Sequence, residues 1–437
     1  MGTMEKKFKL IEIVKYLPIF TLICFWEVNA QIANDDNTVK YQYSVIDTPY
    51  GDYYGLIILT DVTHEATESL WKIVTLAMDK HILDILTDYQ ISSFGKVTHT
   101  ELSRALKDSI SHDKFTRFLS GEDFTGKQLW EYVKRTVREV EQGDAIIAMD
   151  DSVAEKEYSD ENELVTWHYD HSKGRSVKGM NILSALYYSK GVSLPIGMDL
   201  VRKTAWAKDE KTGREKRVSE RTKNEMYRDI LRHVADNQVK FKWVVNDVWY
   251  ASAENMVFVK GGLDKDFVMP VKNNRKVALT LPDKNRGCYV GVESLSLEPG
   301  MRQQVYLEGV TFPVHLIKEV YVNEDNSTAS LYLVCSDLTQ TFQQIITIYE
   351  KRWKVEEYHK SLKSNVALCG SPAHTVRTQA NHVFTCLIAF IKLEKMKVNK
   401  KLNHFAMKAI LYTKAMEKAL TELKKLKAGT QLKLNFA

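Results

Sequence analysis

The sequence lacks several of the patterns that define special classes of protein. It contains only eight prolines in 437 residues and no low-complexity tract, which excludes collagen-like and proline-rich disordered chains. Its five cysteines are an odd number, widely scattered and without a Cys-x2-Cys pair: Cys24, Cys288, Cys335, Cys369 and Cys386. This usage predicts reduced thiols rather than a disulfide framework or a cysteine-based zinc site.

A hydrophobic run long enough for a membrane span is also missing from the N-terminal region. The uncharged run at residues 16–26, YLPIFTLICFW, follows four lysines. It is too short to cross a bilayer, which takes about 20 residues. Its length suits the core of a signal peptide, and the Val-Asn-Ala at residues 28–30 resembles a cleavage site. A buried strand or helix is the alternative interpretation.

The overall charge balance is only mildly basic. Lys and Arg number 61 against 56 Asp and Glu, a formal net charge of +5, which permits a nucleic-acid partner without requiring one. With 44% hydrophobic and 27% charged residues the composition is that of an ordinary globular protein. The length allows two or three domains and a large core.

Two short helices are predicted near residue 110. Thr98–Leu106 and Ser111–Leu119 each begin with a capping hydroxyl residue, and a short turn joins them. This is the size of a helix-turn-helix, which would place Lys114 and Arg117 on its second helix. A helical hairpin without DNA contact is the alternative.

Two apolar strands are followed by acidic residues. Gly143–Met149 leads into Asp150 and Asp151, and Lys240–Asn246 leads into Asp247. Acids at strand ends are a common way to place catalytic carboxylates, although a solvated turn is also compatible with the first of them.

Other segments show clear but less specific patterns. Residues 182–188 and 192–198 predict a strand hairpin, Glu220–Asp236 an amphipathic helix, and residues 251–336 a series of strands. Residues 202–228 hold an excess of cations that either form a solvated loop or contact phosphates. Residues 380–395 predict a core helix, and residues 391–428 a basic helical tail.

Ile348–Lys363 (IYEKRWKVEEYHKSLK) is the most distinctive stretch. It contains no Gly or Pro and predicts a single helix. On that helix Tyr349, Arg352, Glu356 and Lys363 fall within an arc of roughly 60°. A carboxylate flanked by cations and a phenol suits a site that holds a metal beside phosphate.

Two strand-end aspartates and Glu356 together match the needs of two-metal phosphoryl transfer. Mg²⁺ takes oxygen ligands and completes its shell with water and substrate phosphate. Two ions about 3.5–4 Å apart activate the attacking oxygen and stabilise the leaving oxygen.

At this helix the chain resembles the DDE transposases of bacterial insertion sequences. The pattern Tyr-x2-Arg-x3-Glu-x6-Lys is that of the cut-and-paste IS-four family. The Asp-Asp-Ser after an apolar strand looks like the first motif of that family, and the Val-Val-Asn-Asp-Val-Trp-Tyr ending at Tyr250 looks like the second. The resemblance covers roughly residues 78–400.

The resemblance implies an α/β fold in which an RNase H-like catalytic core, a mixed sheet flanked by helices, is interrupted by a β-rich insertion domain. An N-terminal helical region would bind DNA. The implied segments are an extension of unclear role (1–77), the helical region (78–140), the first part of the core (141–250), the insertion domain (251–338), the second part of the core (339–400) and a basic helical tail (401–437).

The resemblance also implies roles for individual residues. Asp151, Asp247 and Glu356 would bind two Mg²⁺ ions, for which Mn²⁺ substitutes. Asp151 is preferred because the family's first acid directly precedes Ser or Thr, and Asp150 is the alternative.

The remaining residues of the signature would contact DNA. Tyr349, Arg352 and Lys363 would hold terminal phosphates. For Trp353, core packing is favoured over stacking on a base.

His168 and His171 have a spacing that suits zinc, but no second pair accompanies them, and a hydrogen-bonded structural role is favoured.

We therefore expect a cytoplasmic, nucleoid-associated transposase. It would act on double-stranded DNA as a homodimer, cleaving element ends and joining them to target DNA without a membrane or a small-molecule cofactor. A catalytically silent DNA-binding regulator and a stand-alone RNase H-like nuclease are the alternatives.

Overall fold

The computed structural model describes residues 79–170, 173–210, 213–322 and 325–428, together with the backbone of three earlier strands. The chain divides into two compact units, Met1–Leu86 with His99–Phe118 and Thr87–Thr98 with Leu119–Ala437. Most of the apolar run at residues 16–26 lies outside the described residues, and the signal-peptide hypothesis stays untested. Among the helices that are described, none has the length and apolar character needed to span a bilayer.

The first unit contains a small antiparallel sheet and a helical hairpin. Its strands are β1 (Phe25–Val28), β2 (Tyr41–Asp47) and β3 (Tyr53–Leu59), with β2 in the middle. Its helices are α2 (His99–Ala105) and α3 (His112–Ser120). Between them Lys107 and Asp108 have φ angles of 54° and 56°, a left-handed conformation that reverses the chain within a few residues. The predicted pair of short helices is confirmed.

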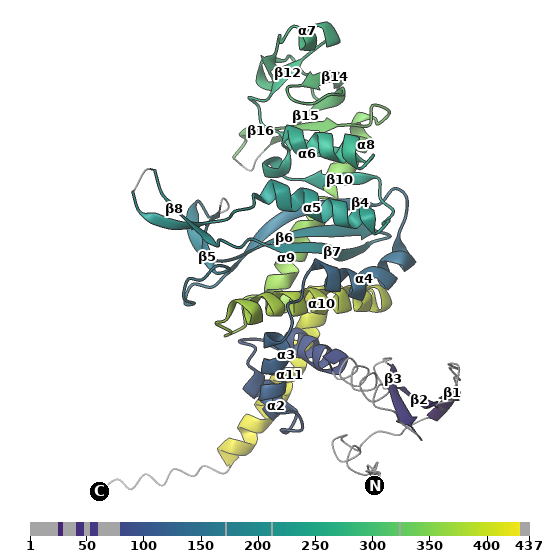
Figure 1. Ribbon diagram of the computed structural model, residues 1–437, viewed down its shortest axis with the longest axis vertical. Coiled ribbons are helices and arrows are strands. Elements are labelled where there is room, and N and C mark those ends of the chain that lie inside the picture. Colours follow the sequence, from purple (N-terminus) through teal and green to yellow (C-terminus); the bar gives the residue numbers. More distant parts are fainter. Residues whose placement is uncertain are drawn as a thin grey trace, which may run out of the picture. The chain divides into compact units, whose positions relative to one another are not determined.

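A large mixed sheet forms the centre of the second unit (Figure 1). Its central strands are β4 (Ile146–Glu155), β5 (Thr166–Asp170), β6 (Arg175–Ser189), β7 (Val192–Leu200), β10 (Trp243–Asn246) and β11 (Asp266–Val271). β7, β6 and β4 are antiparallel neighbours, whereas β4, β10 and β11 run parallel. The order β7-β6-β4-β10-β11 brings β4, which contains Asp150 and Asp151, next to β10, which Asp247 follows.

The predicted β-rich segment is hydrogen-bonded to this sheet. Its further strands are β12 (Lys276–Ala278), β13 (Val290–Gly291), β14 (Arg302–Leu307), β15 (Val314–Val322) and β16 (Thr328–Cys335). β16 returns antiparallel to β11, with Val271 opposite Tyr332. Short helical turns lie between the strands: η3 (Val248–Tyr250), α6 (Ala253–Val257), η4 (Phe258–Gly262), α7 (Leu281–Asn285) and η5 (Val292–Ser294).

Helices cover both faces of the central sheet. They are α4 (Gly126–Val140), α5 (Lys223–Asp236), α8 (Phe342–Glu350), α9 (Trp353–Asn365) and α10 (Val376–Lys400). The last helix, α11 (His404–Ala428), packs against α9 and α10 instead of the sheet. A Cβ on Gly197 of β7 would lie 2.6 Å from Cγ2 of Ile230, so α5 rests directly on that strand. On the other face the hydroxyl of Tyr358 in α9 lies 3.2 Å from Oγ of Ser184, and its ring meets Phe390 of α10 edge-on.

Local sequence signals explain several of these elements. The two-residue turn between β6 and β7 is Lys190-Gly191, with φ angles of 49° and 78°, as a tight hairpin requires. Thr222 and Glu225 form a capping box that starts α5. The predicted hairpin and amphipathic helix are therefore both present. The predicted core helix lies within α10, which is buried along most of its length.

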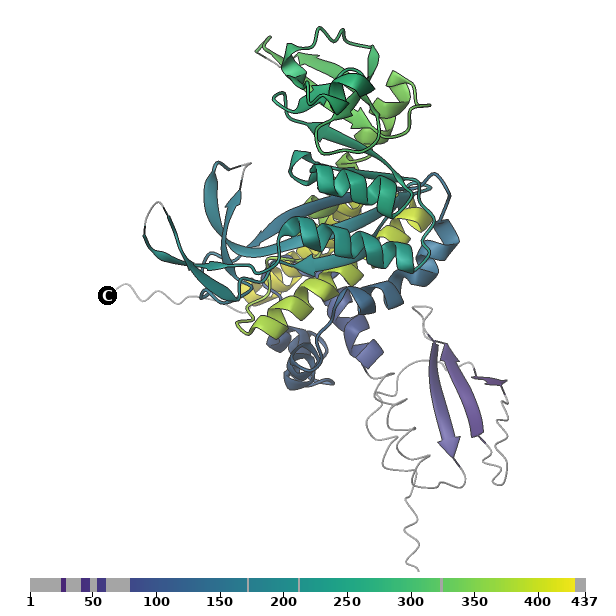
Figure 2. The same cartoon turned by 45° about the horizontal axis from the view of Figure 1, so that its top comes forward.

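A second hairpin in the basic stretch projects from the body of this unit (Figure 2). It consists of β8 (Ala205–Lys208) and β9 (Glu215–Val218). The guanidinium of Arg217 lies 4.5 Å from the ring centre of Trp206, which is 58% exposed. Thus an exposed aromatic side chain carries a cation on its face.

Candidate functional site

The two consecutive aspartates lie in the middle of β4, which continues to Glu155, and not at the end of the strand as predicted. Because successive side chains of a strand point to opposite faces, Asp150 and Asp151 cannot share one site directly. Asp150 lies opposite Ser184, the residue that contacts α9. Asp151 instead bonds to Lys223 of α5.

Asp151 is held by a network of direct contacts. Its Oδ2 accepts hydrogen bonds from Nζ of Lys223 and Nδ2 of Asn181, both at 2.6 Å, and its Oδ1 accepts one from the hydroxyl of Tyr250. Burial tends to raise the pKa of this carboxyl, but the ammonium and these hydrogen bonds outweigh it and lower the pKa. Asp151 therefore ties β4 to α5, β6 and the turn that carries Tyr250.

Asp150 has the opposite environment. It is buried, and the pKa of its carboxyl is raised well above the usual range by that burial and by the neighbouring charges of Asp247, Asp151 and Glu356. Its Oδ1 accepts a hydrogen bond from the backbone N–H of Asp151 at 2.8 Å. A carboxylate crowded by other carboxylates is typical of a site built for a cation.

Asp247 follows the last residue of β10, as predicted. Asn246 pairs with Met149 in the parallel ladder, which brings Asp247 next to Asp150 on the neighbouring strand. Its Oδ1 accepts the backbone N–H of Trp249 at 2.8 Å and so caps the following turn. Burial raises the pKa of Asp247, and the hydrogen bond from Trp249 opposes the rise.

The prediction of a single helix at residues 348–363 is wrong in one respect. It is broken at residues 351–352 into the end of α8 and the start of α9. The backbone N–H groups of Lys351, Arg352, Lys354 and Val355 each bond to the carbonyl three residues earlier, a tighter winding than the α-helix. Tyr349 and Arg352 still meet across the break, with the guanidinium 5.9 Å from the ring centre.

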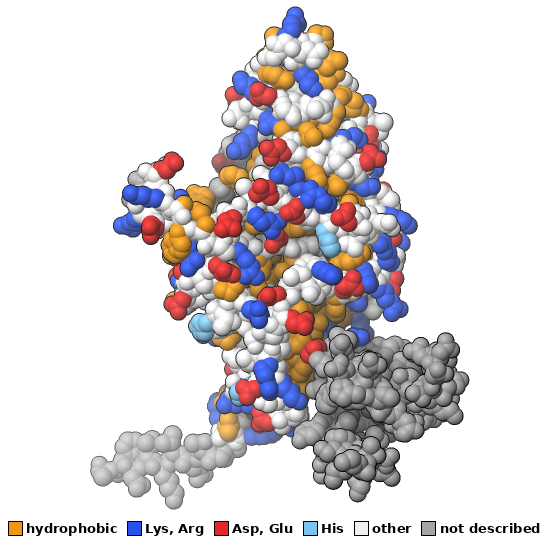
Figure 3. Space-filling view, in the orientation of Figure 1, with side chains coloured by type: hydrophobic (Ala, Val, Ile, Leu, Met, Phe, Trp, Pro, Cys, Tyr) orange, Lys and Arg blue, Asp and Glu red, His pale blue; other side chains and the backbone are white. Residues whose placement is uncertain are grey.

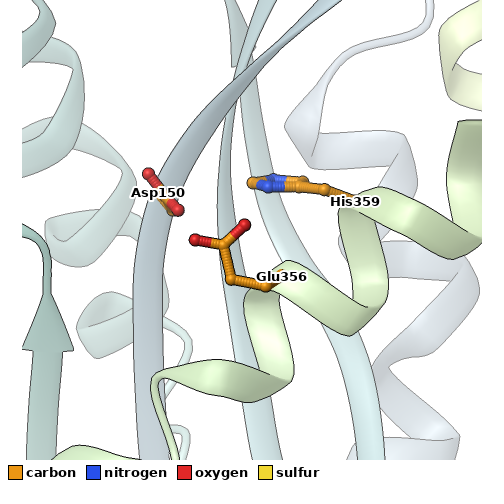
Figure 4. A group of neighbouring side chains, drawn as sticks. All are labelled: Asp150, Glu356 and His359. Atoms are coloured by element: carbon orange, nitrogen blue, oxygen red, sulfur yellow. The ribbon is translucent and has the colours of Figure 1, made fainter. Parts of the chain in front are cut away.

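Glu356 and His359, on successive turns of α9, face Asp150 (Figure 4). One ligand atom from each of the three side chains lies within 4.8 Å of the other two, a group that could hold a metal ion. His359 is only 6% exposed, and its Nε2 is buried without a hydrogen-bond partner. Burial lowers the pKa of His359 to about 3, and the ring is neutral with a lone pair available.

His359 was not identified from the sequence. The available signal was the spacing Glu-x2-His on a predicted helix, which puts both side chains on one face. A carboxylate and an imidazole at this spacing form a recurrent metal-binding pair on helices. The residues present therefore fit a divalent cation: crowded carboxylates and one unpartnered buried nitrogen.

Arg352 lies between two of these carboxylates. Its Nη1 is 3.0 Å from Oε1 of Glu356 and 3.9 Å from Oδ2 of Asp150. The guanidinium thus compensates part of the negative charge of the cluster.

The other predicted DNA-contacting residues lie around the cluster or on α3. Lys363 is exposed near the end of α9. Trp353 is 62% exposed, so the favoured core-packing interpretation is wrong. Trp249, close to Asp247, is 54% exposed with Nζ of Lys272 at 5.3 Å from its ring centre. Lys114 and Arg117 are exposed on α3 of the first unit.

Of the two histidines with zinc-like spacing, the structure describes His168. His168 is buried, and its Nε2 lies 2.9 Å from Oγ1 of Thr166. His171 lies outside the described residues. The structural role favoured from the sequence thus agrees with the contact seen for His168.

Two family models match parts of the sequence that include the residues of the acidic cluster. A model of DDE superfamily endonucleases matches residues 75–288, which include Asp150 and Asp247. A model of the archaeal ISC1217 transposases matches residues 198–404, which include Asp247, Glu356 and His359.

The matches support a DDE transposase. They imply an enzyme of the nuclease type and are consistent with DNA as its partner. The mixed sheet with helices on both faces is consistent with a DDE nuclease fold. No curated protein matches the sequence.

Proposed function

We propose that this chain is a cut-and-paste DDE transposase of the IS-four type, which binds the inverted-repeat ends of an insertion sequence, cleaves there and joins the ends to target DNA. The observation that carries the proposal is the convergence of Asp150, Asp247 and Glu356. They come from a central strand, the end of its parallel neighbour and a helix on one sheet face.

The strand order supports an RNase H-like core. β7, β6 and β4 are antiparallel and β10 and β11 continue in parallel, with the first two acids on the adjacent strands β4 and β10. The β-rich segment between Asp247 and Glu356 would be the insertion domain of such a transposase. The α2–α3 hairpin would supply its N-terminal DNA-binding region.

The first metal-binding acid in this proposal is Asp150 rather than Asp151. Asp150 lies beside Glu356, whereas both carboxylate oxygens of Asp151 already accept hydrogen bonds. Their donors are Lys223, Asn181 and Tyr250. Asp151 would position the site instead, because it holds the turn that follows Asp247 against β4.

Asp150, Asp247 and Glu356 would hold the divalent ions, Mg²⁺ with Mn²⁺ as a substitute. When bound, two such ions activate the attacking oxygen and stabilise the leaving oxygen of the phosphodiester. The chain's own part is to crowd the carboxylates so that they favour a cation. Exposed Trp249 and Trp353, flanking the acids, offer faces on which unpaired bases stack.

DNA contact would depend on local groups of cations. On the face of the second unit seen in Figure 3, acidic and basic side chains are interspersed. Tyr349, Arg352 and Lys363 near the acids would hold the terminal phosphates, and Lys114 and Arg117 on α3 would contact the duplex. Joining two ends requires a homodimer on DNA, and such a protein would be cytoplasmic and associated with the nucleoid.

The test is cleavage of double-stranded oligonucleotides that carry the terminal sequences flanking the coding region. The purified full chain is expected to nick them at the element end in Mg²⁺ or Mn²⁺ and to join the end to a second duplex. Glu356→Gln should abolish both reactions while leaving DNA affinity unchanged. The matched control is Glu357→Gln, on the neighbouring exposed position of α9.

Other results would point to the alternatives. Cleavage without preference for element ends and without joining would indicate a stand-alone nuclease. End binding without metal-dependent cleavage would indicate a DNA-binding regulator. Cleavage by Glu356→Gln at the parent rate would exclude the proposed site.

A further inference from the structure

A buried imidazole completes one side of the acidic cluster. Glu356 and His359 are three residues apart on α9, the spacing that makes side chains neighbours on a helix. α9 is fixed against the sheet by Tyr358, which contacts Ser184 and packs edge-on against Phe390. The His359 ring is tilted against that of Tyr358, with 5.2 Å between their centres. Its position is therefore set by packing rather than by a hydrogen bond of its own.

The unpartnered nitrogen of His359 needs an explanation. A buried polar atom without a partner destabilises the folded state relative to one that is hydrogen-bonded. Nε2 of His359 is such an atom, although the cations Lys363 and Arg352 and the acids Asp150 and Glu356 are its neighbours. A ligand that accepts its lone pair would remove this cost.

Its placement suits metal ligation. A ring nitrogen of His359 and one oxygen each from Asp150 and Glu356 lie within 4.8 Å of one another. Two ligand atoms of a small divalent ion are about 3 Å apart when adjacent and about 4.2 Å apart when opposite, so the three atoms lie near the separations that one shared ion requires. The three atoms come from a strand and a helix that are packed together, and Figure 4 shows them facing one another.

We propose that His359 is a direct metal ligand beside Asp150 and Glu356, and that this nitrogen makes the site favour Mn²⁺ over Mg²⁺. The inference rests on the proposed function and deepens it. Imidazole suits first-row transition ions, whereas Mg²⁺ prefers oxygen ligands and retains its water. An all-carboxylate site would bind the two ions with less discrimination.

The rival explanation is that His359 only orients Glu356 by a hydrogen bond. A spectroscopic measurement separates the two explanations, because only a coordinated nitrogen couples strongly to the electron spin of Mn²⁺. The test therefore uses Mn²⁺ alone with the full chain and records electron spin-echo envelope modulation. The parent is expected to show nitrogen modulation that changes when histidine is labelled with the heavy nitrogen isotope.

Two variants accompany the spectra. His359→Asn should lose the modulation and bind Mn²⁺ about tenfold more weakly, with a smaller change for Mg²⁺. His168→Asn is the matched control, since His168 is also a buried histidine but lies outside the ligand group. It should keep the modulation and the affinity. Circular dichroism checks folding, and isotope labelling of the parent gives an answer even where a variant unfolds.

The outcomes separate this inference from the proposed function. If Mn²⁺ binding needs Glu356 but the spectra show no nitrogen coupling, His359 is not a ligand and the transposase proposal stands. If neither Glu356→Gln nor His359→Asn changes Mn²⁺ binding, the metal site itself is wrong and both proposals fall.

Discussion

Nη1 of Arg352, the residue that precedes α9, lies 3.0 Å from Oε1 of Glu356 in the first turn of that helix, and 3.9 Å from Oδ2 of Asp150 on the sheet. Without a bound cation, the guanidinium supplies positive charge beside the carboxylates of Glu356 and Asp150. In the proposed site a bound metal ion would therefore compete with Arg352 for the same carboxylates. When a phosphate is present, the guanidinium has a better partner and can leave them.

Arg352→Gln should raise the affinity of the DNA-free protein for Mn²⁺ roughly threefold to tenfold, because a competing opposite charge beside a carboxylate is removed. Cleavage should nevertheless fall, since the phosphate loses its guanidinium. Isothermal titration with Mn²⁺ measures the first effect. Lys354→Gln is the control, because Nζ of Lys354 lies 2.9 Å from a carboxylate oxygen of Glu357, and this pair is not part of the acidic cluster. Unchanged affinity in Arg352→Gln would show that the two cations do not compete.

Asp150→Asn and Asp151→Asn should have different consequences although the residues are adjacent. Asp150→Asn should reduce cleavage roughly a hundredfold or more, since metal ligation contributes several kcal/mol to the barrier. It should also raise the melting temperature of the metal-free protein, because Asp150 is crowded by like charge.

Asp151→Asn should instead lower the free energy of unfolding by about 1–3 kcal/mol, because Lys223 loses a partly buried partner. Mn²⁺ affinity should remain close to that of the parent. Thermal melts and metal titrations of the two variants side by side measure both effects. The reverse pattern would restore Asp151 as the first metal-binding acid.

The junction of α10 and α11 predicts a dependence of stability on pH. Glu394 is only 3% exposed, with His404 Nε2 at 3.1 Å and Lys397 Nζ at 2.6 Å. Burial tends to raise its pKa, but His404, Lys397 and the backbone N–H of Ser193 together lower it below the ordinary value of 4.5. The folded state therefore favours the charged form, so the stabilisation is present above pH 4.5 and is lost as the pH falls through the lowered pKa.

Glu394→Gln should thus reduce the free energy of unfolding by about 3 kcal/mol at neutral pH, and the difference from the parent should shrink in acid. Urea denaturation at a series of pH values measures it. Glu417 forms an exposed ion pair with Lys414 on α11. Glu417→Gln should therefore change the free energy of unfolding little at any pH. A difference that stays constant in acid would exclude the ionic contribution.

Lys363→Ala should weaken binding to every duplex by a similar factor and reduce the slope of log affinity against log salt by about 0.9, the loss of one phosphate contact. Lys354→Ala is the matched control on the same helix, since its charge is already paired with Glu357. Fluorescence anisotropy over a range of salt concentrations gives both slopes. Equal slopes for Lys363→Ala and the parent would remove Lys363 from the DNA interface.

The sequence was sufficient for the acids whose position follows from local pattern. Asp247 after an apolar strand and Glu356 within a charged helix both lie close enough to Asp150 to raise its pKa. The choice between Asp150 and Asp151 could not be made in this way. It depends on which sheet face each side chain meets, and β4 continues five residues beyond Asp150.

Two further features also required the three-dimensional arrangement. The break before Trp353 leaves no mark in the residue pattern, because neither Gly nor Pro is present. His359 had a readable spacing, but its significance comes from burial without a partner. The hairpin of α2 and α3, by contrast, was predictable from the helical periods and the capping residues of the sequence.

The return of β16 alongside β11 has a consequence for how this chain can vary. Val271 and Tyr332 face each other across one ladder, and neighbouring strands are about 4.8 Å apart. The sixty residues between them, 272–331, begin and end at almost the same place. Exchanging them for a tight turn would therefore join β11 directly to β16 and leave the path from Asp247 to Glu356 intact. Residues 272–331 and the residues of the proposed site are therefore free to diverge separately.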